Sequence, residues 1–293
     1  MNRLLTKTLF ALFSLGIALS ANPAYAASVF LTGHDPDFHA SNAAGTAIDS
    51  QGAVNINNTA IGFIMDATFN LSVAGGATKF LFVESSISPP GGHRVGKNGI
   101  IQSGYTEGPD FDHADASTLN ARLDQLGTVY GGIVIASDFG GLLAQAELDI
   151  LNTRSTDIID FLNIGNGGLY AMAEGNSGSG LTPGGGHFGF LPFVVSATGL
   201  NQSEAGTTVT AFGASLGLTD LDVSSNFSHN IFNDSFGLNI VDVDSAGNIL
   251  TLAGRGIIDP GTGVNPVPVP AAIWLFATGL LGLIGYGKRA KSS

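Results

Sequence analysis

Two apolar segments without charged residues flank the middle of this chain and restrict which part of it can build a globular core. The first, Leu9 to Leu19, follows Arg3 and Lys7 and precedes Ala24-Tyr25-Ala26. This order of positive charge, apolar run and A-x-A site is typical of a secretory signal peptide. The run is also shorter than the ~20 residues that a membrane-spanning helix needs. We therefore predict a signal peptide over residues 1–26, handled by the Sec translocon and signal peptidase; a buried N-terminal helix is the alternative.

The second apolar segment covers residues 271–287. As a helix it would be roughly 25 Å long, which is short for a bilayer but workable with flanking anchors. Trp274 and Tyr286 stand near its two ends, where aromatic rings favour the membrane interface. The tail, residues 288–293, carries three basic residues. We predict a transmembrane helix with a cytoplasmic tail and the domain outside.

Three alternating prolines precede this helix. Proline cannot continue a helix and favours an extended, accessible chain. The segment reads Val267, Pro268, Val269, Pro270, Ala271, Ala272. With the apolar helix and basic tail it resembles the VPLPA type of PEP-CTERM sorting signal, although leucine is commoner than valine at position 269. The resemblance covers about the last 28 residues. It implies processing near the motif by an exosortase, a membrane enzyme; a permanent single-pass anchor is the alternative.

The middle of the chain, residues 27–261, is predicted to be the exported domain, and residues 262–270 its linker and sorting motif. All 23 acidic residues lie between the two apolar segments, together with only six of the 11 basic residues, which gives this part a net charge of −17. Nucleic acid is therefore an unfavourable partner, because phosphate binding needs a basic face. The chain has no cysteine, which excludes disulfides, a cysteine nucleophile and thiolate metal sites.

Short apolar runs alternate with helical patterns in this middle part, which favours an α/β domain whose mostly parallel sheet is flanked by helices. A turn-rich segment at residues 244–247 predicts a C-terminal hairpin. The predicted strands are 28–32, 79–83, 132–136 and 169–173; the predicted helices are 61–71, 117–126, 144–162 and 208–218; the hairpin strands are 238–243 and 248–252.

The order of these elements, over about residues 28–255, resembles class I glutamine amidotransferase-like domains, which have a flavodoxin-like sheet. That family carries a nucleophilic cysteine after a strand. Here the corresponding stretch, residues 169–176, offers Glu174 at the strand end instead. Amidotransferase chemistry of the usual kind is therefore excluded.

Ligands of an open parallel sheet bind outside the carboxyl ends of its strands. Polar residues follow all four predicted strands, and we expect them at one edge, called here the rim. They are His34, Asp35, Asp37 and His39; Glu84 and Ser85; Ser137 and Asp138; and Glu174 and Asn176.

The cluster from His34 to His39 combines carboxylate and imidazole groups, which are suitable ligands for a divalent metal that activates water. The alternative is that the carboxylates cap the next segment while the histidines satisfy loop backbone. A second acidic stretch, Asp110 to Asp115, suggests calcium less strongly, since loops before helices often look like this. His229 is either a general base or a structural loop histidine.

The sequence thus leaves three readings open. The first is an exported surface or matrix protein whose domain binds an unknown ligand without turnover. The second is a metal-assisted extracellular hydrolase that uses the His34 to His39 cluster with Asp138, Glu174 or His229. The third is a β-sandwich adhesin, which a substantial helix content would exclude.

Overall fold

The computed structural model describes residues 26–85, 94–138, 143–172, 181–182, 186–191, 193–202, 206–224, 228–259 and 263–266. The predicted sorting motif, membrane helix and tail lie outside these residues, as does the predicted signal peptide except for Ala26. None of the helices in the described ranges is long and apolar enough to cross a membrane.

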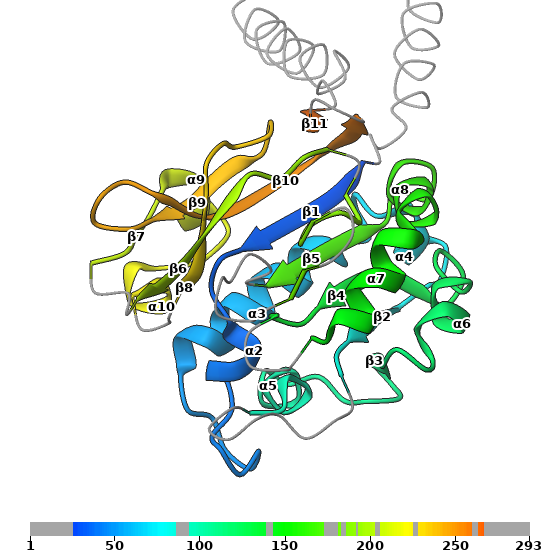
Figure 1. Ribbon diagram of the computed structural model, residues 1–293, viewed down its shortest axis with the longest axis horizontal. Coiled ribbons are helices and arrows are strands. Elements are labelled where there is room, and N and C mark those ends of the chain that lie inside the picture. The colour runs from blue at the N-terminus through cyan, green and yellow to red at the C-terminus, as the bar shows by residue number, and fades with distance from the viewer. Residues whose placement is uncertain are drawn as a thin grey trace, which may run out of the picture. The chain divides into compact units, whose positions relative to one another are not determined.

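A single mixed sheet organises the domain (Figure 1). Its main path runs β3-β2-β4-β5-β1-β10-β8-β6, with β11 and β9 paired to β10 and β7 paired to β9. The first five strands of that path are parallel, and β10 is antiparallel to β1. The strands are β1 (Ala27–Thr32), β2 (Lys79–Val83), β3 (Phe111–Ala114), β4 (Tyr130–Ile135), β5 (Gly168–Met172), β6 (Ala197–Gln202), β7 (Thr208–Val209), β8 (Ser228–Phe232), β9 (Asn239–Val243), β10 (Ile249–Asp259) and β11 (Gly263–Pro266).

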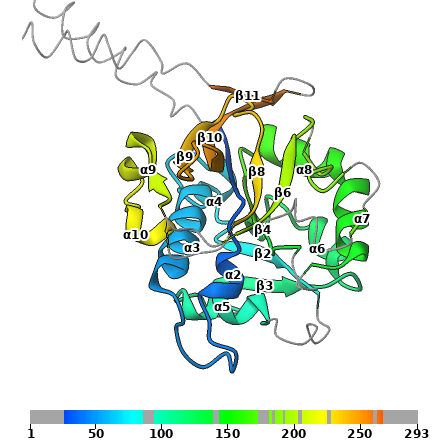
Figure 2. The ribbon, with the colours of Figure 1, turned by 60° about the vertical axis from the view of Figure 1, so that its left-hand side comes forward.

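Helices cover both faces of the sheet (Figure 2). They are α2 (Pro36–His39), α3 (Gln51–Ile64), α4 (Leu71–Ala74), α5 (Gly96–Gln102), α6 (Leu119–Leu123), α7 (Gln145–Thr153), α8 (Ser155–Asn163), α9 (Ala211–Ser215) and α10 (Asp220–Val223). The predicted α/β fold with a mostly parallel sheet is thereby confirmed, and the β-sandwich reading is excluded.

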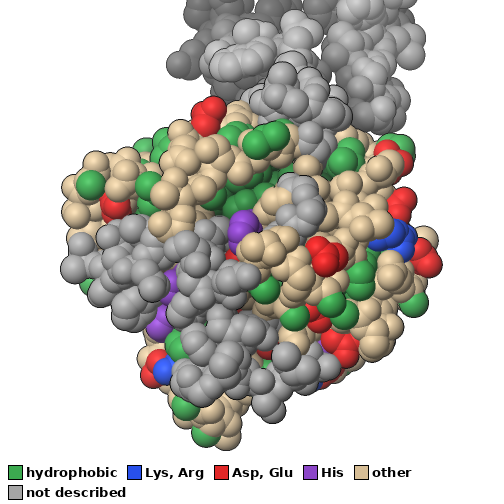
Figure 3. Space-filling view, viewed as in Figure 1, with side chains coloured by type: hydrophobic (Ala, Val, Ile, Leu, Met, Phe, Trp, Pro, Cys, Tyr) green, Lys and Arg blue, Asp and Glu red, His purple; other side chains and the backbone are tan. Residues whose placement is uncertain are grey.

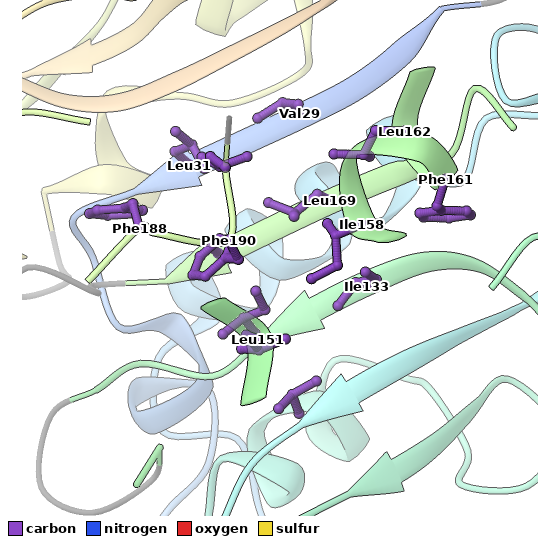
Figure 4. Packing of buried hydrophobic residues seen from close by; sticks show 14 of the residues in the cluster. Val29, Leu31, Ile133, Leu151, Ile158, Phe161, Leu162, Leu169, Phe188 and Phe190 are labelled. Carbon is purple, nitrogen blue, oxygen red and sulfur yellow. The ribbon is translucent and has the colours of Figure 1, made fainter. Parts of the chain in front are cut away.

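Alternating side chains of the buried strands divide the core into two clusters, because successive residues of a strand point to opposite faces. On one face, Val29, Leu31 and Leu169 pack with apolar residues of α7 and α8 (Figure 4). On the other, Phe30 and Tyr170 join the cluster that contains α3. Strands that are buried on both faces read as continuous apolar runs, which is why the four central strands were predictable.

Several element predictions need correction. The predicted helix 61–71 is wrong, because α3 begins at Gln51 after the N-cap Ser50 and ends at Ile64. The predicted helix 144–162 is interrupted at Arg154, and the helix predicted over residues 208–218 begins as β7. The predicted terminal hairpin is confirmed by the pairing of β9 with β10. Residues 263–266, assigned to the linker, form β11.

The acidic stretch at residues 110–115 is not a loop, because most of it forms the edge strand β3. Asp112 lies 3.4 Å from Lys79 and 3.3 Å from Arg122. Asp115 instead accepts hydrogen bonds from the residues that follow it. These carboxylates have separate structural partners, so the arrangement does not favour the calcium prediction.

Both ends of the compact unit Tyr25–Pro266 lie at one edge of the sheet. Ala27, the first residue of β1, pairs with Gly256 of β10, and Gly256 also pairs with Pro266 at the end of β11. Because β1 runs from Ala27 toward its carboxyl end, the rim is at the opposite edge.

Candidate functional site

Three parallel strands deliver buried polar residues to the rim. β1 leads to His34, Asp35 and Asp37, β2 leads to Glu84, and β4 leads to Ser137 and Asp138; all of them are buried. The fourth predicted contribution, Glu174 and Asn176 after β5, lies outside the described residues.

Asp37 joins the ends of β1 and β4. Its Oδ2 accepts hydrogen bonds from the Ser137 backbone N–H at 3.0 Å and from the Ser137 hydroxyl at 3.1 Å. Burial, with a smaller contribution from the charge of Asp35, raises the pKa of Asp37 to about 7, although the bonds from Ser137 oppose this shift. α5 packs directly on it, since a Cβ on Gly99 would lie 2.0 Å from the Asp37 carbonyl oxygen.

Glu84 caps α5 from the end of β2. Its two carboxylate oxygens accept hydrogen bonds from the backbone N–H groups of Gly96, at 2.7 Å, and Lys97, at 2.9 Å. Burial is the main cause that raises the pKa of Glu84 to about 8. The group therefore has a structural role at the start of a helix whose own N-cap, Val95, provides no side-chain acceptor.

Asp35 lies between two imidazoles. Its Oδ1 is 3.3 Å from Nε2 of His39, and its Oδ2 is 3.0 Å from Nε2 of His229. The Asp35 side chain is 1% exposed and that of His39 is 14% exposed, so the cluster reaches the surface through His39. Burial lowers the pKa of His39, and Asp35 opposes this shift. His229 thus belongs to the buried strand β8 rather than to a loop.

His34 turns away from this cluster. Its Nε2 lies 3.0 Å from Oδ2 of Asp242 on β9, and both side chains are buried. Within the predicted metal cluster Asp35 contacts His39, whereas His34 and Asp37 face other partners, because the chain turns into α2 between them. Within the described part of the chain, no group of three or more His, Asp or Glu residues is arranged to hold a metal ion. This geometry does not favour the metal prediction.

Asp138 is paired with a residue that the sequence analysis did not select. The buried Oδ2 of Asp138 lies 3.1 Å from Nδ1 of His187, whose side chain is 31% exposed. His187 follows a glycine-rich stretch, and such a stretch reads as a turn from sequence. Only the three-dimensional proximity reveals this pair.

The described surface also contains an open groove of about 610 Å³ next to His39. Histidine side chains reach the surface on the face shown in Figure 3, beside residues that are not described. The groove is lined by His39, Asp49, Ser50, Gln51, Gly52, Thr219, Leu221 and Asp222. The sequence pointed only to His39 among these residues, because the opposite wall comes from α10, which is distant along the chain from α2 and the start of α3.

Comparison with known proteins found no matching family model, no matching curated protein and no matching solved structure. The two resemblances drawn from sequence therefore remain predictions.

Proposed function

We propose that this chain is an exported protein that an exosortase processes for display at the cell surface or in the extracellular matrix, where its α/β domain binds a ligand through the rim. In this proposal residues 1–26 direct export, residues 271–287 hold the chain in the membrane and residues 267–272 are the processing motif. The partners are the Sec machinery, signal peptidase and the exosortase.

The observation that carries the proposal is the extent of the compact unit. It runs from Tyr25 to Pro266, so it ends one residue before Val267 and begins close to the predicted cleavage after Ala26. Processing at both predicted sites would leave its strands intact, because β1 begins at Ala27 and β11 ends at Pro266.

The sheet topology supports the same proposal. Both ends of the compact unit leave from the edge opposite the rim. A tether at that edge would leave the rim and the groove accessible to extracellular ligands.

The test is expression of the chain in a bacterium that has an exosortase of the VPLPA type. We expect the double variant Pro268→Ala/Pro270→Ala to stay in the membrane fraction at its unprocessed mass, while the wild-type chain is processed. Pro266→Ala is the matched control, since this proline lies one residue outside the motif, and it should be processed normally. Equal processing of the double variant and the wild-type chain would contradict the proposal.

A hydrolase is the second candidate function, and one observation favours it. The imidazole of His39 lines the groove while the buried carboxylate of Asp35 contacts it. A carboxylate that orients an imidazole is a common arrangement for general-base catalysis.

A further inference from the structure

Two apolar side chains are exposed at the edge of the sheet where β1 begins. Leu71, the first residue of α4, is 41% exposed, and Ile164, directly after α8, is 74% exposed. The backbone N–H and the hydroxyl of Ser72 both donate to the Gly165 carbonyl, at 3.2 Å and 2.9 Å. The residues that follow the two apolar side chains are therefore in direct contact. We call Leu71 and Ile164 the apolar edge patch.

This patch lies beside the first residues of the domain. The Ala26 backbone N–H donates to the Phe69 carbonyl at 3.2 Å, two residues before the first half of the patch. The Ser28 N–H donates to the Gly167 carbonyl at 3.1 Å, three residues after the second half. β11 ends at the same edge, because its last residue and the first residue of β1 pair with the same residue of β10. The chain thus enters and leaves the domain next to the patch.

An arginine holds the turn between α3 and α4 against the sheet. The guanidinium of Arg255 on β10 lies between the rings of Phe63 and Phe69, with its Cζ 3.9 Å from each ring centroid. Arg255 also donates to the Ser28 hydroxyl at 3.3 Å and to the Asp66 carboxylate at 3.2 Å. Cation–π contacts and these hydrogen bonds fix the turn to the first strand. The segment that leads to Leu71 is therefore well anchored.

Only a short stretch of chain separates this edge from the predicted membrane helix. Residue 271, where that helix is predicted to begin, is five positions after Pro266, the last residue of β11. Five residues span at most about 18 Å when they are fully extended. A contact between the patch and the bilayer would thus form within one molecule, at a high effective concentration.

We propose that the apolar edge patch lies on the outward-facing surface of the membrane that anchors the chain, with Leu71 and Ile164 inserted at the boundary between headgroups and acyl chains. This inference rests on the proposed function, because it requires the predicted membrane helix. Burial of exposed apolar surface stabilises the contact. Charge attraction does not, since the formal net charge of −17 opposes binding to anionic lipids. The rim then faces away from the bilayer.

The experiment uses the full chain reconstituted into phosphatidylcholine vesicles. Because the chain has no cysteine, one introduced cysteine carries an environment-sensitive fluorophore at a single site. Thr68→Cys places the fluorophore at an exposed position near the patch, and Leu221→Cys, at an 81% exposed position of the groove, is the matched control. We expect lipids with a quenching group near the headgroup end of the acyl chain to quench the label at position 68 much more strongly than the label at position 221.

Leu71→Ser/Ile164→Ser distinguishes an apolar contact from mere proximity to the membrane. In this double variant we expect the label at position 68 to lose most of its quenching by lipid. Ile48→Ser/Leu221→Ser is the matched control, because it replaces two exposed apolar side chains outside the patch, and quenching at position 68 should be unchanged. Exposed side chains contribute little to stability, and thermal unfolding checks that both double variants fold.

Equal quenching at positions 68 and 221, or undiminished quenching in the Leu71→Ser/Ile164→Ser variant, would overturn the proposal. A blue-shifted emission at position 68 that the quenching lipids do not reduce would place a second copy of the chain on the patch, and would also overturn it. A chain that does not float with the vesicles would contradict the membrane anchor of the proposed function as well as this inference. Flotation without quenching at position 68 would contradict this inference alone.

Discussion

Asp37 and Glu84 are buried carboxyl groups whose raised pKa values, about 7 and about 8, link the stability of the domain to pH. Each group binds a proton more tightly in the folded state than in the unfolded chain. Its contribution to stability is therefore complete below the unfolded pKa and is lost as pH rises through the folded pKa. Burial of His39 and His113 has the opposite effect, because it lowers the pKa of each, and their contribution is lost as pH falls below about 6.5.

The free energy of unfolding should therefore decrease between pH 6.5 and pH 8.5, a range that lies above the lowered pKa values of His39 and His113. One pKa unit corresponds to about 1.4 kcal/mol, so the expected loss is on the order of a few kcal/mol. Urea-induced unfolding at the two pH values measures it. Asp37→Asn and Glu84→Gln should each make the pH dependence shallower, and an equal dependence in both variants and the wild-type chain would contradict this assignment.

Residue types and positions at the rim were predictable, but their partners were not. Asp35, Asp37 and Glu84 follow strands that read clearly from their apolar runs, so their place at one edge follows from parallel pairing. The partner of Asp35 is 194 positions away at His229, and that of His34 is 208 positions away at Asp242. Such pairs depend on how β8 and β9 pack beside β1, which no local pattern encodes.

At the scale of elements, the contact between β5 and α3 depends on a glycine. A Cβ on Gly168 would lie 2.4 Å from the Ile64 carbonyl oxygen and 2.6 Å from its Cβ. Gly62 is two residues earlier on the same helix, and a Cβ there would meet nothing within 4 Å. Replacement of each glycine by alanine therefore separates the effect of close packing, at Gly168, from the effect of helix propensity, at Gly62.

We expect Gly168→Ala to lower the free energy of unfolding by about 1–3 kcal/mol, because the backbone of α3 must move away from the sheet. Gly62→Ala should be neutral or raise it by up to about 1 kcal/mol, since alanine is the better helix former. Denaturant-induced unfolding of both variants measures the difference. A Gly168→Ala variant as stable as Gly62→Ala would show that the two elements do not pack this closely.

A helix or strand could be predicted where a short stretch of sequence carries its full apolar pattern. β2 lies at the predicted residues because its apolar run is uninterrupted. The predicted position of α3 was wrong because its buried face includes the polar residue Asn57, whose side-chain amide donates hydrogen bonds to Pro36 and Ser103. This polar residue interrupts the apolar stripe by which a helix is recognised in a sequence. β3 was missed because the polar residues Asp112 and His113 are adjacent and separate its two buried residues, so this edge strand is neither an apolar run nor an alternating pattern.

At the scale of the whole molecule, a folded unit lies between two segments for which we propose roles in export and sorting. The first and last strands of the unit Tyr25–Pro266 both pair with Gly256 of β10 at their outer ends, and the rim lies at the opposite ends of the parallel strands. Its formal net charge of −17 favours solubility. Export, processing and exposure of the rim are thus compatible with one fold.

The most direct test of this account is the intact mass of the chain recovered from an exosortase-containing host, with sequencing of both termini. We predict a protein that begins at Ala27 and ends within residues 267–272. A chain that retains the residues before Ala27 and extends to Ser293 would contradict the central claim.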